Sequence, residues 1–358
     1  MTNVDKNYDV IVVGGGHNGL ICATYLARDG RKVLVVEAND SLGGASMTSQ
    51  FSDNFSVSSC AHWLFQLNSD VASDMGINGS TLELAARDLS PIALAEDGNH
   101  LTISRDKLEG AGISEDDQKA FIAFNKQINK FCKLLDGAFK RRAPKLVEGN
   151  LTDRITLAKL GLGMKMLGKE DMSDLMRLAL INIYDVMEEN FDNELLKGAI
   201  SLDSLLGSHM GPRSPNTVYG YIYRQMGEAY GYHGPAVVKG GMGAVGDALA
   251  DSARKSGVDI EMGTPVNNIN VDIDRATGVT LSDGRIFDAP IVVSNADPKT
   301  TFNKLVGLAN IETGVARRVK TMRMKGDTAK MHLALDGLPS FSGLVKSQLE
   351  RKRVGEGM

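Results

Sequence analysis

The sequence predicts an α/β fold, organised as two domains or as one large α/β unit. Three observations lead to this prediction. Residues 8–37 have the pattern of a strand, a glycine turn, a helix and a second strand. Residues 105–207 have a mostly helical pattern, and residues 258–294 return to short strands and turns. The chain has 358 residues, which is enough for a substantial core.

The first unit can be assigned element by element. Residues 9–13 form a short, β-branched apolar run, as in a strand that is buried on both faces. A helix is expected from about Asn18 to Asp29, with Gly30 just beyond its end. Residues 32–37 then form the return strand, which ends in an acid.

The glycines of this unit have the spacing of a dinucleotide-binding motif. Gly14 permits the tight turn, Gly16 lets a pyrophosphate approach the backbone, and Gly19 lets the helix pack closely on the strand. The helix N-terminus offers free N–H groups to the pyrophosphate. Glu37 would accept hydrogen bonds from ribose hydroxyls, and an acid there argues against a 2′-phosphate.

Composition excludes several classes of protein. The net charge of −4, without basic clusters interleaved with aromatic residues, gives no reason to expect nucleic-acid binding. The three distant cysteines, Cys22, Cys60 and Cys132, fit a reducing compartment and no disulfide framework. Neither a signal segment nor a membrane span is recognised, so a cytoplasmic protein is expected. The six scattered histidines predict no metal site.

Gly43 and Gly44 follow shortly after the acid and favour FAD over NAD. A simple nicotinamide dehydrogenase has no evident need for a glycine pair here, whereas a long FAD-wrapped first domain passes close to its cofactor at this point. A nicotinamide-dependent dehydrogenase is therefore the disfavoured alternative.

Four stretches resemble the phytoene-desaturase-like branch of the FAD-dependent amine oxidase superfamily. They are GGGHNGLICATYLARDGRKVLVVEANDSLGGAS, DVMEENFDNELLKGAIS, PNTVYGYIYRQMGE and VKGGMGAVGDALADSARKSGVDI. The resemblance implies a discontinuous, Rossmann-like FAD-binding domain of the glutathione reductase type, with an inserted α+β substrate domain. It places the FAD-binding domain at residues 1–90 and 235–308 and the substrate domain at 91–234 and 309–358.

The same resemblance implies further site residues and an activity. Val266 matches the position whose backbone contacts the adenine, and Asn295-Ala296 matches the return of the chain to the adenosine. The implied reaction moves a hydride from a lipophilic or amine-like small molecule to the flavin, with oxygen or a quinone as electron acceptor. No catalytic residue is assigned. The alternatives are a non-catalytic lipid- or prenyl-group-binding escort protein on the same scaffold and an inactive truncated flavoprotein.

The helical middle contains two start signals and one ambiguous segment. Ser114 and Ser173 each precede acids and a helical pattern, and both are expected to cap helices. The segment ITLAKLGLGMKMLGKE, residues 155–170, mixes leucine and methionine with lysines. It is either an interfacial patch that contacts a membrane or a packed helix with snorkelling lysines, and the packed helix is favoured.

Two further segments have open interpretations. Residues 208–234 hold five of the eight tyrosines and form either an aromatic pocket wall facing the flavin or alternating strands and turns. His62 either lies close to the flavin or substrate, or is a structural histidine with satisfied hydrogen bonds, and the structural role is favoured.

The C-terminal part differs from the resembled family. No late Gly-Asp segment of the kind that contacts the ribityl chain is found, because Gly246-Asp247 lies within a predicted helix and Gly326-Asp327 lacks the following glycine-rich turn. The chain ends instead in the polar segment VKSQLERKRVGEGM. A C-terminally truncated product is therefore expected.

Overall fold

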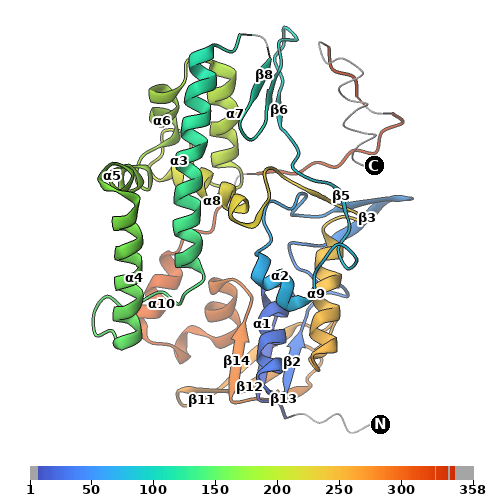
Figure 1. The fold of residues 1–358 in the computed structure, drawn as a ribbon. Helices are drawn as coiled ribbons and strands as arrows, with labels where there is room; N and C mark the ends of the chain where they lie inside the picture. Colours follow the sequence, from blue (N-terminus) through green and yellow to red (C-terminus); the bar gives the residue numbers. More distant parts are fainter. Residues whose placement is uncertain (1–6, 111, 327, 338, 343–358) are drawn as a thin grey trace.

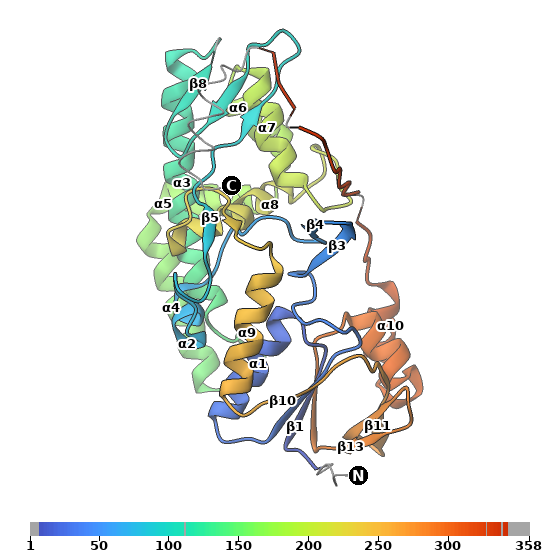
Figure 2. The same cartoon turned by 90° about the vertical axis from the view of Figure 1, so that its right-hand side faces the viewer.

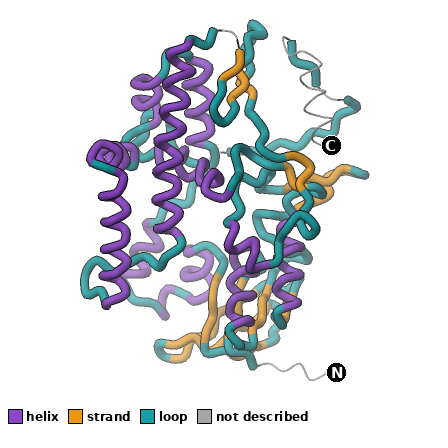
Figure 3. Tube along the Cα trace, viewed as in Figure 1, coloured by secondary structure: helices purple, strands orange, loops and turns teal. Residues whose placement is uncertain are grey.

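The computed structural model describes residues 7–110, 112–326, 328–337 and 339–342 (Figure 1). The larger sheets lie at one end of the molecule, and the longest helices lie at the other beside a small sheet of short strands, as the colouring of Figure 3 shows. The first elements of the chain lie beside elements that follow residue 240, so the strand-rich end is assembled from segments far apart in sequence. The segment 345–358 and Asp327 lie outside the described residues.

A parallel sheet forms the centre of the strand-rich end. Its strand order is β10–β2–β1–β14, and all three neighbouring pairs are parallel. The strands are β1 (Val10–Val13), β2 (Val33–Val36), β10 (Asp259–Glu261) and β14 (Ile291–Ser294). Residues from both ends of the chain therefore hydrogen-bond to one another, as a discontinuous domain requires.

Both faces of this sheet are covered, which explains its continuous apolar strands. Val10 and Val12 pack in the core with α1 (His17–Arg28) and α9 (Gly243–Lys255). Ile11 and Val13 point to the other face and pack against an antiparallel sheet (Figure 2). That second sheet consists of β11 (Val266–Asp272), β12 (Arg275–Leu281) and β13 (Ile286–Asp288).

The turns of this half follow the sequence prediction. The first helix ends at Arg28, and Gly30 takes a left-handed φ of +84° beyond it. The turn at Asp283-Gly284 joins β12 to β13 as an antiparallel hairpin, in keeping with the short strands and turns expected over residues 258–294. The Asp-Gly pair at Asp97-Gly98 likewise lies in the turn of a hairpin, whose paired strands are short.

The helical end has its own core, in which Phe121, Ile128, Phe131 and Ile222 are almost fully buried. Its helices are α3 (Glu115–Phe139), α4 (Leu151–Leu167), α5 (Lys169–Leu178), α6 (Ile183–Asn190), α7 (Glu194–Leu205) and α8 (Thr217–Arg224), followed by the 3₁₀ helix η1 (Gln225–Tyr230). A small sheet of β6 (Ile92–Ala93), β7 (Leu101–Ile103) and β8 (Leu108–Gly110) packs beside them.

Shorter elements connect and flank these parts. They are β3 (Thr48–Ser52), β4 (Phe55–Ser58), α2 (Ser69–Met75), β5 (Leu84–Ala86), β9 (Val237–Val238), the π-helix η2 (Thr300–Val306), the 3₁₀ helix η3 (Leu308–Asn310) and α10 (Thr313–Thr321). β3 pairs with β4, and β5 pairs with β9.

One of the two predicted helix starts is wrong. Ser114 caps α3 as expected, because its hydroxyl accepts a hydrogen bond from Asp117 N. Ser173 instead lies inside α5, and the predicted single helix is divided into α5 and α6. The side chain of Asn182 accepts a hydrogen bond from Asp185 N and starts α6. The Asn-x-x-Asp pattern at residues 182–185 is a capping signal. It was missed because the apolar residues on both sides of it keep helical spacing.

Candidate FAD-binding site and a cavity in the helical end

The carboxyl ends of the four parallel strands meet at one edge of the sheet. Gly14 follows β1, Glu37 follows β2, and Asn295 follows β14. Asn295 N donates a hydrogen bond to Val13 O at 2.8 Å, which fixes the end of β14 beside the glycine turn. In open α/β sheets this edge is where ligands bind.

The backbone of the glycine turn leaves no room for side chains. Gly14 has a φ of +102°, which an L side chain rarely tolerates. A Cβ on Gly19 would lie 2.2 Å from Gly14 O, so only glycine allows α1 to approach β1 this closely. A Cβ on Gly16 would lie 2.9 Å from Asn295 Nδ2. The turn and the close helix packing inferred for Gly14 and Gly19 are therefore present.

Glu37 is buried, with 7% of its surface exposed. Its Oε2 accepts a hydrogen bond from Gly15 N at 2.7 Å. Its Oε1 accepts hydrogen bonds from Asn39 N at 3.0 Å and from Asn39 Nδ2 at 2.8 Å. An ionised carboxylate has about four acceptor positions, so this side chain ties the glycine loop to β2 and retains capacity for another donor.

The glycine pair packs directly on the glycine turn. Gly43 N donates to Gly15 O at 2.9 Å, and a Cβ on Gly44 would lie 3.0 Å from Gly16 Cα. A Cβ on Gly43 would lie 3.2 Å from the Cα of Gly246 in α9. The sequence had suggested only a close passage to a cofactor. The structure adds that three backbone segments meet here, and their contact already requires glycine.

Val266 lies near the same edge of the sheet. It begins β11, shortly after β10 ends at Glu261. Glu37 N donates to Glu261 O at 2.8 Å, and Thr264 N donates to Glu37 O at 3.4 Å. The seven residues predicted to bind the cofactor therefore converge on one edge, although they come from segments separated by more than 200 positions.

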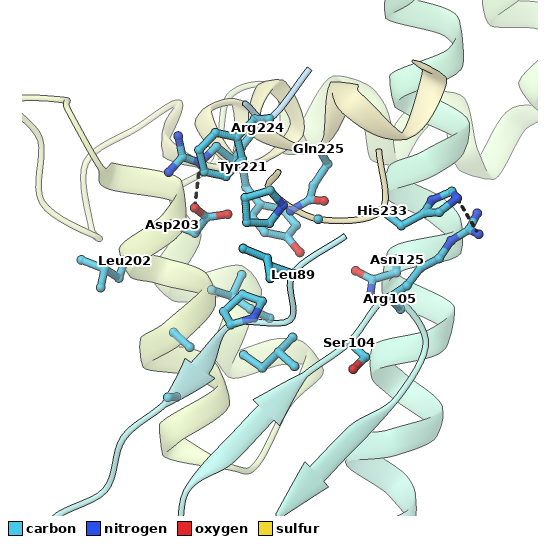
Figure 4. Close-up of a pocket in the computed structure, with 18 of the residues that line it drawn as sticks. Leu89, Ser104, Arg105, Asn125, Leu202, Asp203, Tyr221, Arg224, Gln225 and His233 are labelled. Carbon is cyan, nitrogen blue, oxygen red and sulfur yellow. Dashed lines mark hydrogen bonds and ion pairs between the residues drawn. The ribbon is translucent and has the colours of Figure 1, made fainter. Parts of the chain in front are cut away.

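A cavity of about 640 Å³ opens in the helical end (Figure 4). α3, α7, α8, the 3₁₀ helix η1, β6 and β7 contribute to its lining, together with Trp63 and Phe65. Much of the lining is apolar, including Leu89, Ile92, Ile103, Ile128, Leu195 and Ile200.

Most charged groups of the cavity are paired with one another, and Glu194 is paired with Lys197 outside the lining. Arg224 Nε donates to Asp203 Oδ1 at 2.8 Å, and the guanidinium lies 3.7 Å from the centre of the Phe65 ring. At another part of the wall, Glu228 Oε2 lies 3.2 Å from Arg105 Nη2 and 3.0 Å from His233 Nδ1. These pairs satisfy the charges within the wall and leave the cavity suited to an apolar occupant.

Residues 208–234 supply part of this wall. Tyr221 and Tyr232 line the cavity, so this segment forms part of a pocket wall. That the wall faces the flavin stays a prediction. The alternative of strands is wrong, since α8 and η1 occupy much of the segment. Burial raises the pKa of the Tyr221 hydroxyl, so this group is neutral at ordinary pH.

Comparison with known proteins identifies the family. Residues 19–305 match the family of flavin-containing amine oxidoreductases, which is most of the chain. The chain belongs to this family. Its cofactor is FAD, and its architecture is the Rossmann-like FAD-binding fold with a substrate domain.

Individual relatives support the phytoene-desaturase-like branch. The chain is 28% identical over 354 residues to mouse pyridine nucleotide-disulfide oxidoreductase domain-containing protein 2, covering 93% of this chain and 61% of that protein. It is 26% identical over 308 residues to a zeta-carotene-forming phytoene desaturase of Myxococcus xanthus, covering 83% of this chain and 55% of the desaturase. The chain thus spans somewhat more than half the length of these relatives.

A solved structure shows the same fold. An oxidoreductase from Methanosarcina mazei superimposes with a TM-score of 0.54 at 20% identity, over 88% of this chain and 65% of that one. At 20% identity, this similarity shows that the two chains share a fold, and it shows nothing about their activities.

The residues of this flavin-containing amine oxidoreductase fit the pyrophosphate of FAD. α1 begins after Gly16 without a side-chain cap and has no acid in its first turn, so its N-terminal N–H groups face no competing carboxylate. His17 Nδ1 is buried and has no hydrogen-bond partner among the described residues. Such an orphaned polar atom beside the glycine turn is explained by a ligand that supplies its partner. Sequence reasoning missed His17 because it occupies a variable position of the motif.

The structure argues against the favoured interpretation of His62, and its proximity to the flavin or substrate stays a prediction. It is exposed rather than buried, and its ring lies 4.8 Å from the ring of Trp63, which lines the cavity. Partial burial and the nearby cations Lys330 and Arg224 lower the pKa of His62. The favoured role of a histidine with satisfied internal hydrogen bonds is therefore not what the structure shows.

The described part of the chain contains no helix long and apolar enough to cross a membrane. Within the same residues, no group of three or more histidine, cysteine or acidic side chains is placed to hold a metal ion.

Proposed function

We propose that the protein is an FAD-dependent desaturase or oxidase that acts on a lipophilic small molecule. One observation carries this proposal: the glycine turn, Glu37 and an uncapped helix N-terminus converge on the carboxyl edge of a parallel sheet. Gly14, Gly16, Gly19, Glu37, Gly43, Gly44 and Val266 are the proposed FAD-binding residues.

When bound, FAD would supply the acceptor for a hydride from a substrate C–H bond, so that loss of a neighbouring proton would leave a C=C or C=N bond, with oxygen or a quinone as the final electron acceptor. The protein's contribution is to hold the adenosine half at the glycine turn and to orient the substrate.

A lipophilic substrate is favoured over an amine. A carboxylate that binds a cationic amine has to be unpaired, yet Glu228 and Asp203 are already paired with Arg105 and Arg224. The third carboxylate of the lining, Glu194, is paired with Lys197. The name of the Myxococcus xanthus relative gives phytoene, a hydrocarbon, as what it desaturates. The apolar wall of the cavity suits such a molecule.

The domain division is part of the same proposal. Residues 1–90 and 235–308 form the FAD-binding domain, and residues 91–234 and 309–358 belong to the substrate domain. The free state of Cys22, Cys60 and Cys132 suits a reducing compartment such as the cytoplasm.

The visible spectrum of the purified protein tests the cofactor. A flavin band, or its appearance after reconstitution with FAD, is expected. Anaerobic bleaching of that band by a terpenoid hydrocarbon, but not by an aliphatic amine, would support the substrate class. A colourless protein that cannot be reconstituted would refute the flavoenzyme proposal and leave a non-catalytic lipid-binding role.

Filling the cavity should abolish turnover without removing FAD. Gly198 of α7 lines the cavity, and a Cβ there meets nothing within 4 Å, so Gly198→Phe places a ring without backbone strain. We expect at least a roughly 100-fold loss in kcat/KM for the substrate that reduces the flavin. The introduced ring would take the place of part of the bound substrate, and losing the contacts of a group of this size costs about 3 kcal/mol. Stopped-flow reduction of the flavin measures it.

The matched control is Gly137→Phe. Gly137 also lies in a helix with open space at its Cβ, but it does not line the cavity. The control should reduce its flavin at the wild-type rate. Equal rates for Gly198→Phe and wild type would show that this cavity is not the substrate site.

A further inference from the structure

One side of α4 exposes a stripe of apolar side chains to solvent. Leu151, Ile155, Leu162 and Met166 are 74%, 46%, 58% and 78% exposed. At 100° per residue, these four positions fall within about 60° of one another around the helix. They therefore form one continuous stripe along α4, which we call the α4 stripe, and scattered exposure does not explain it.

The opposite side of α4 already has its partners. α4 packs on α3 and α5, and the fit is close enough that a Cβ on Gly163 would lie 2.8 Å from Leu134 Cδ1. Asn150 and Asp153 form a capping box that fixes the start of the helix. Figure 1 shows α4 at the outer edge of the helical end, beyond α3. The packed-helix interpretation of residues 155–170 thus accounts for the inner side only.

Basic residues flank the stripe on both edges. Lys159 lies on one edge, and Arg154 and Lys165 lie on the other, by the same helical geometry. All three side chains are exposed. Asp153 is the only acid of α4, and it is buried and bonded to Arg142. The outward surface of α4 therefore carries positive charge without compensation from its own helix.

The loop before α4 extends this surface. Leu146 and Val147 are 82% and 79% exposed, among the most exposed large apolar side chains in the described part of the chain. Arg141 and Lys145 in the same loop are also exposed, as is one acid, Glu148, so the loop too carries a net positive charge.

We propose that α4 and the loop before it lie flat on an anionic membrane surface. An apolar stripe with basic edges is the arrangement of a helix in the membrane interface, where the stripe enters the acyl boundary and the lysines reach anionic headgroups. The apolar side chains of the stripe are more stable in the acyl boundary of a membrane than in water. The basic side chains beside them favour anionic headgroups over zwitterionic ones, and the two features together indicate an anionic membrane. A lipophilic substrate of the proposed enzyme would be reached from this membrane.

This surface is separate from the chemistry. No α4 residue lines the cavity described above, and none contributes to the carboxyl edge of the parallel sheet. Membrane binding and flavin binding can therefore fail independently.

Sedimentation with sucrose-loaded vesicles tests the proposal on the full chain. One vesicle preparation contains phosphatidylcholine alone, and the other contains phosphatidylcholine with phosphatidylserine. Two variants alter the surface: Leu162→Gln with Met166→Gln, and Lys159→Glu with Lys165→Glu. Their controls are Ile273→Gln, which changes a 93% exposed side chain elsewhere, and Lys255→Glu with Arg275→Glu, which makes the same change in net charge.

The wild type and both controls should bind the anionic vesicles and bind the zwitterionic vesicles at least tenfold more weakly. The lysine variant should lose about 25-fold or more in partition coefficient, at about fivefold per lysine removed. The Leu162/Met166 variant should also lose binding.

Absence of wild-type binding, equal binding to both vesicle types, or wild-type binding by both α4 variants would overturn the proposal. Self-association of wild type through α4, detected by ultracentrifugation, would overturn it in favour of a second copy. Unchanged circular dichroism shows that the variants are folded.

Discussion

Gly19→Ala is expected to give a destabilised protein that no longer retains FAD. The new Cβ would lie 2.2 Å from Gly14 O, which is backbone and cannot rotate away. α1 must therefore move from β1, and the N–H groups of its first turn move with it. Overpacking of this kind costs about 3 kcal/mol or more when the neighbour is rigid. Thermal unfolding and the flavin content of the purified protein measure the two effects.

The matched control is Gly137→Ala. Both glycines lie within helices, but a Cβ on Gly137 meets nothing within 4 Å. This control should be neutral or about 1 kcal/mol more stable, since alanine favours the helix more than glycine does. If Gly19→Ala retained full flavin and wild-type stability, the close packing of α1 on β1 would not be required for the site.

Glu37→Ala should weaken FAD binding by about 10- to 100-fold. It removes the acceptor for Gly15 N, which then lies unpaired in the glycine turn, and it removes the proposed acceptor for the ribose hydroxyls. Hydrogen bonds to a charged group are worth about 1.5–3 kcal/mol each, and 1.4 kcal/mol corresponds to a factor of ten. Titration of the apoprotein with FAD, followed by flavin fluorescence, measures the change.

Two further variants separate the contributions of Glu37. Glu37→Gln keeps one oxygen for Gly15 N and should fall between wild type and Glu37→Ala. Glu83→Ala removes an exposed acid that pairs only with Lys239 among the described contacts, and its affinity for FAD should be unchanged. An unaltered affinity in Glu37→Ala would remove Glu37 from the proposed binding residues.

The nucleotide-binding half was predictable because its sequence rules are local. β-Branched residues at 9–13, the spacing of Gly14, Gly16 and Gly19, and Gly30 beyond the helix each satisfy a requirement of a few neighbouring residues. The helical half was less predictable. Its periodicity continued across residues 179–182, where the chain in fact turns and Asn182 starts a new helix.

The cavity was only partly visible in the sequence. The tyrosines of residues 208–234 indicated a wall, but they gave no sign that the segment is helical. The ion pairs of Glu228 with Arg105 and of Asp203 with Arg224 join distant segments, so no spacing rule indicates them. They matter because they neutralise the charged groups of an otherwise apolar wall.

The exposed stripe on α4 shows the same limit. The sequence of residues 151–167 allows either side of an apolar helix to face the core, since leucine and methionine occur all around it. Gly163 lets α4 approach Leu134 at one edge of its inner side, and the centre of the stripe, about 90° away around the helix, is left to solvent.

The sequence by itself determined the motif, the cofactor class and the kind of fold, because each depends on residues that are close along the chain. The tertiary structure decided which groups meet. It placed Gly43 and Gly44 between the glycine turn and α9, brought Asn295 over Gly16, and left His17 Nδ1 buried without a hydrogen-bond partner among the described residues. These are contacts between segments separated by up to about 280 positions, and they depend on the packing of strands and helices rather than on local preference.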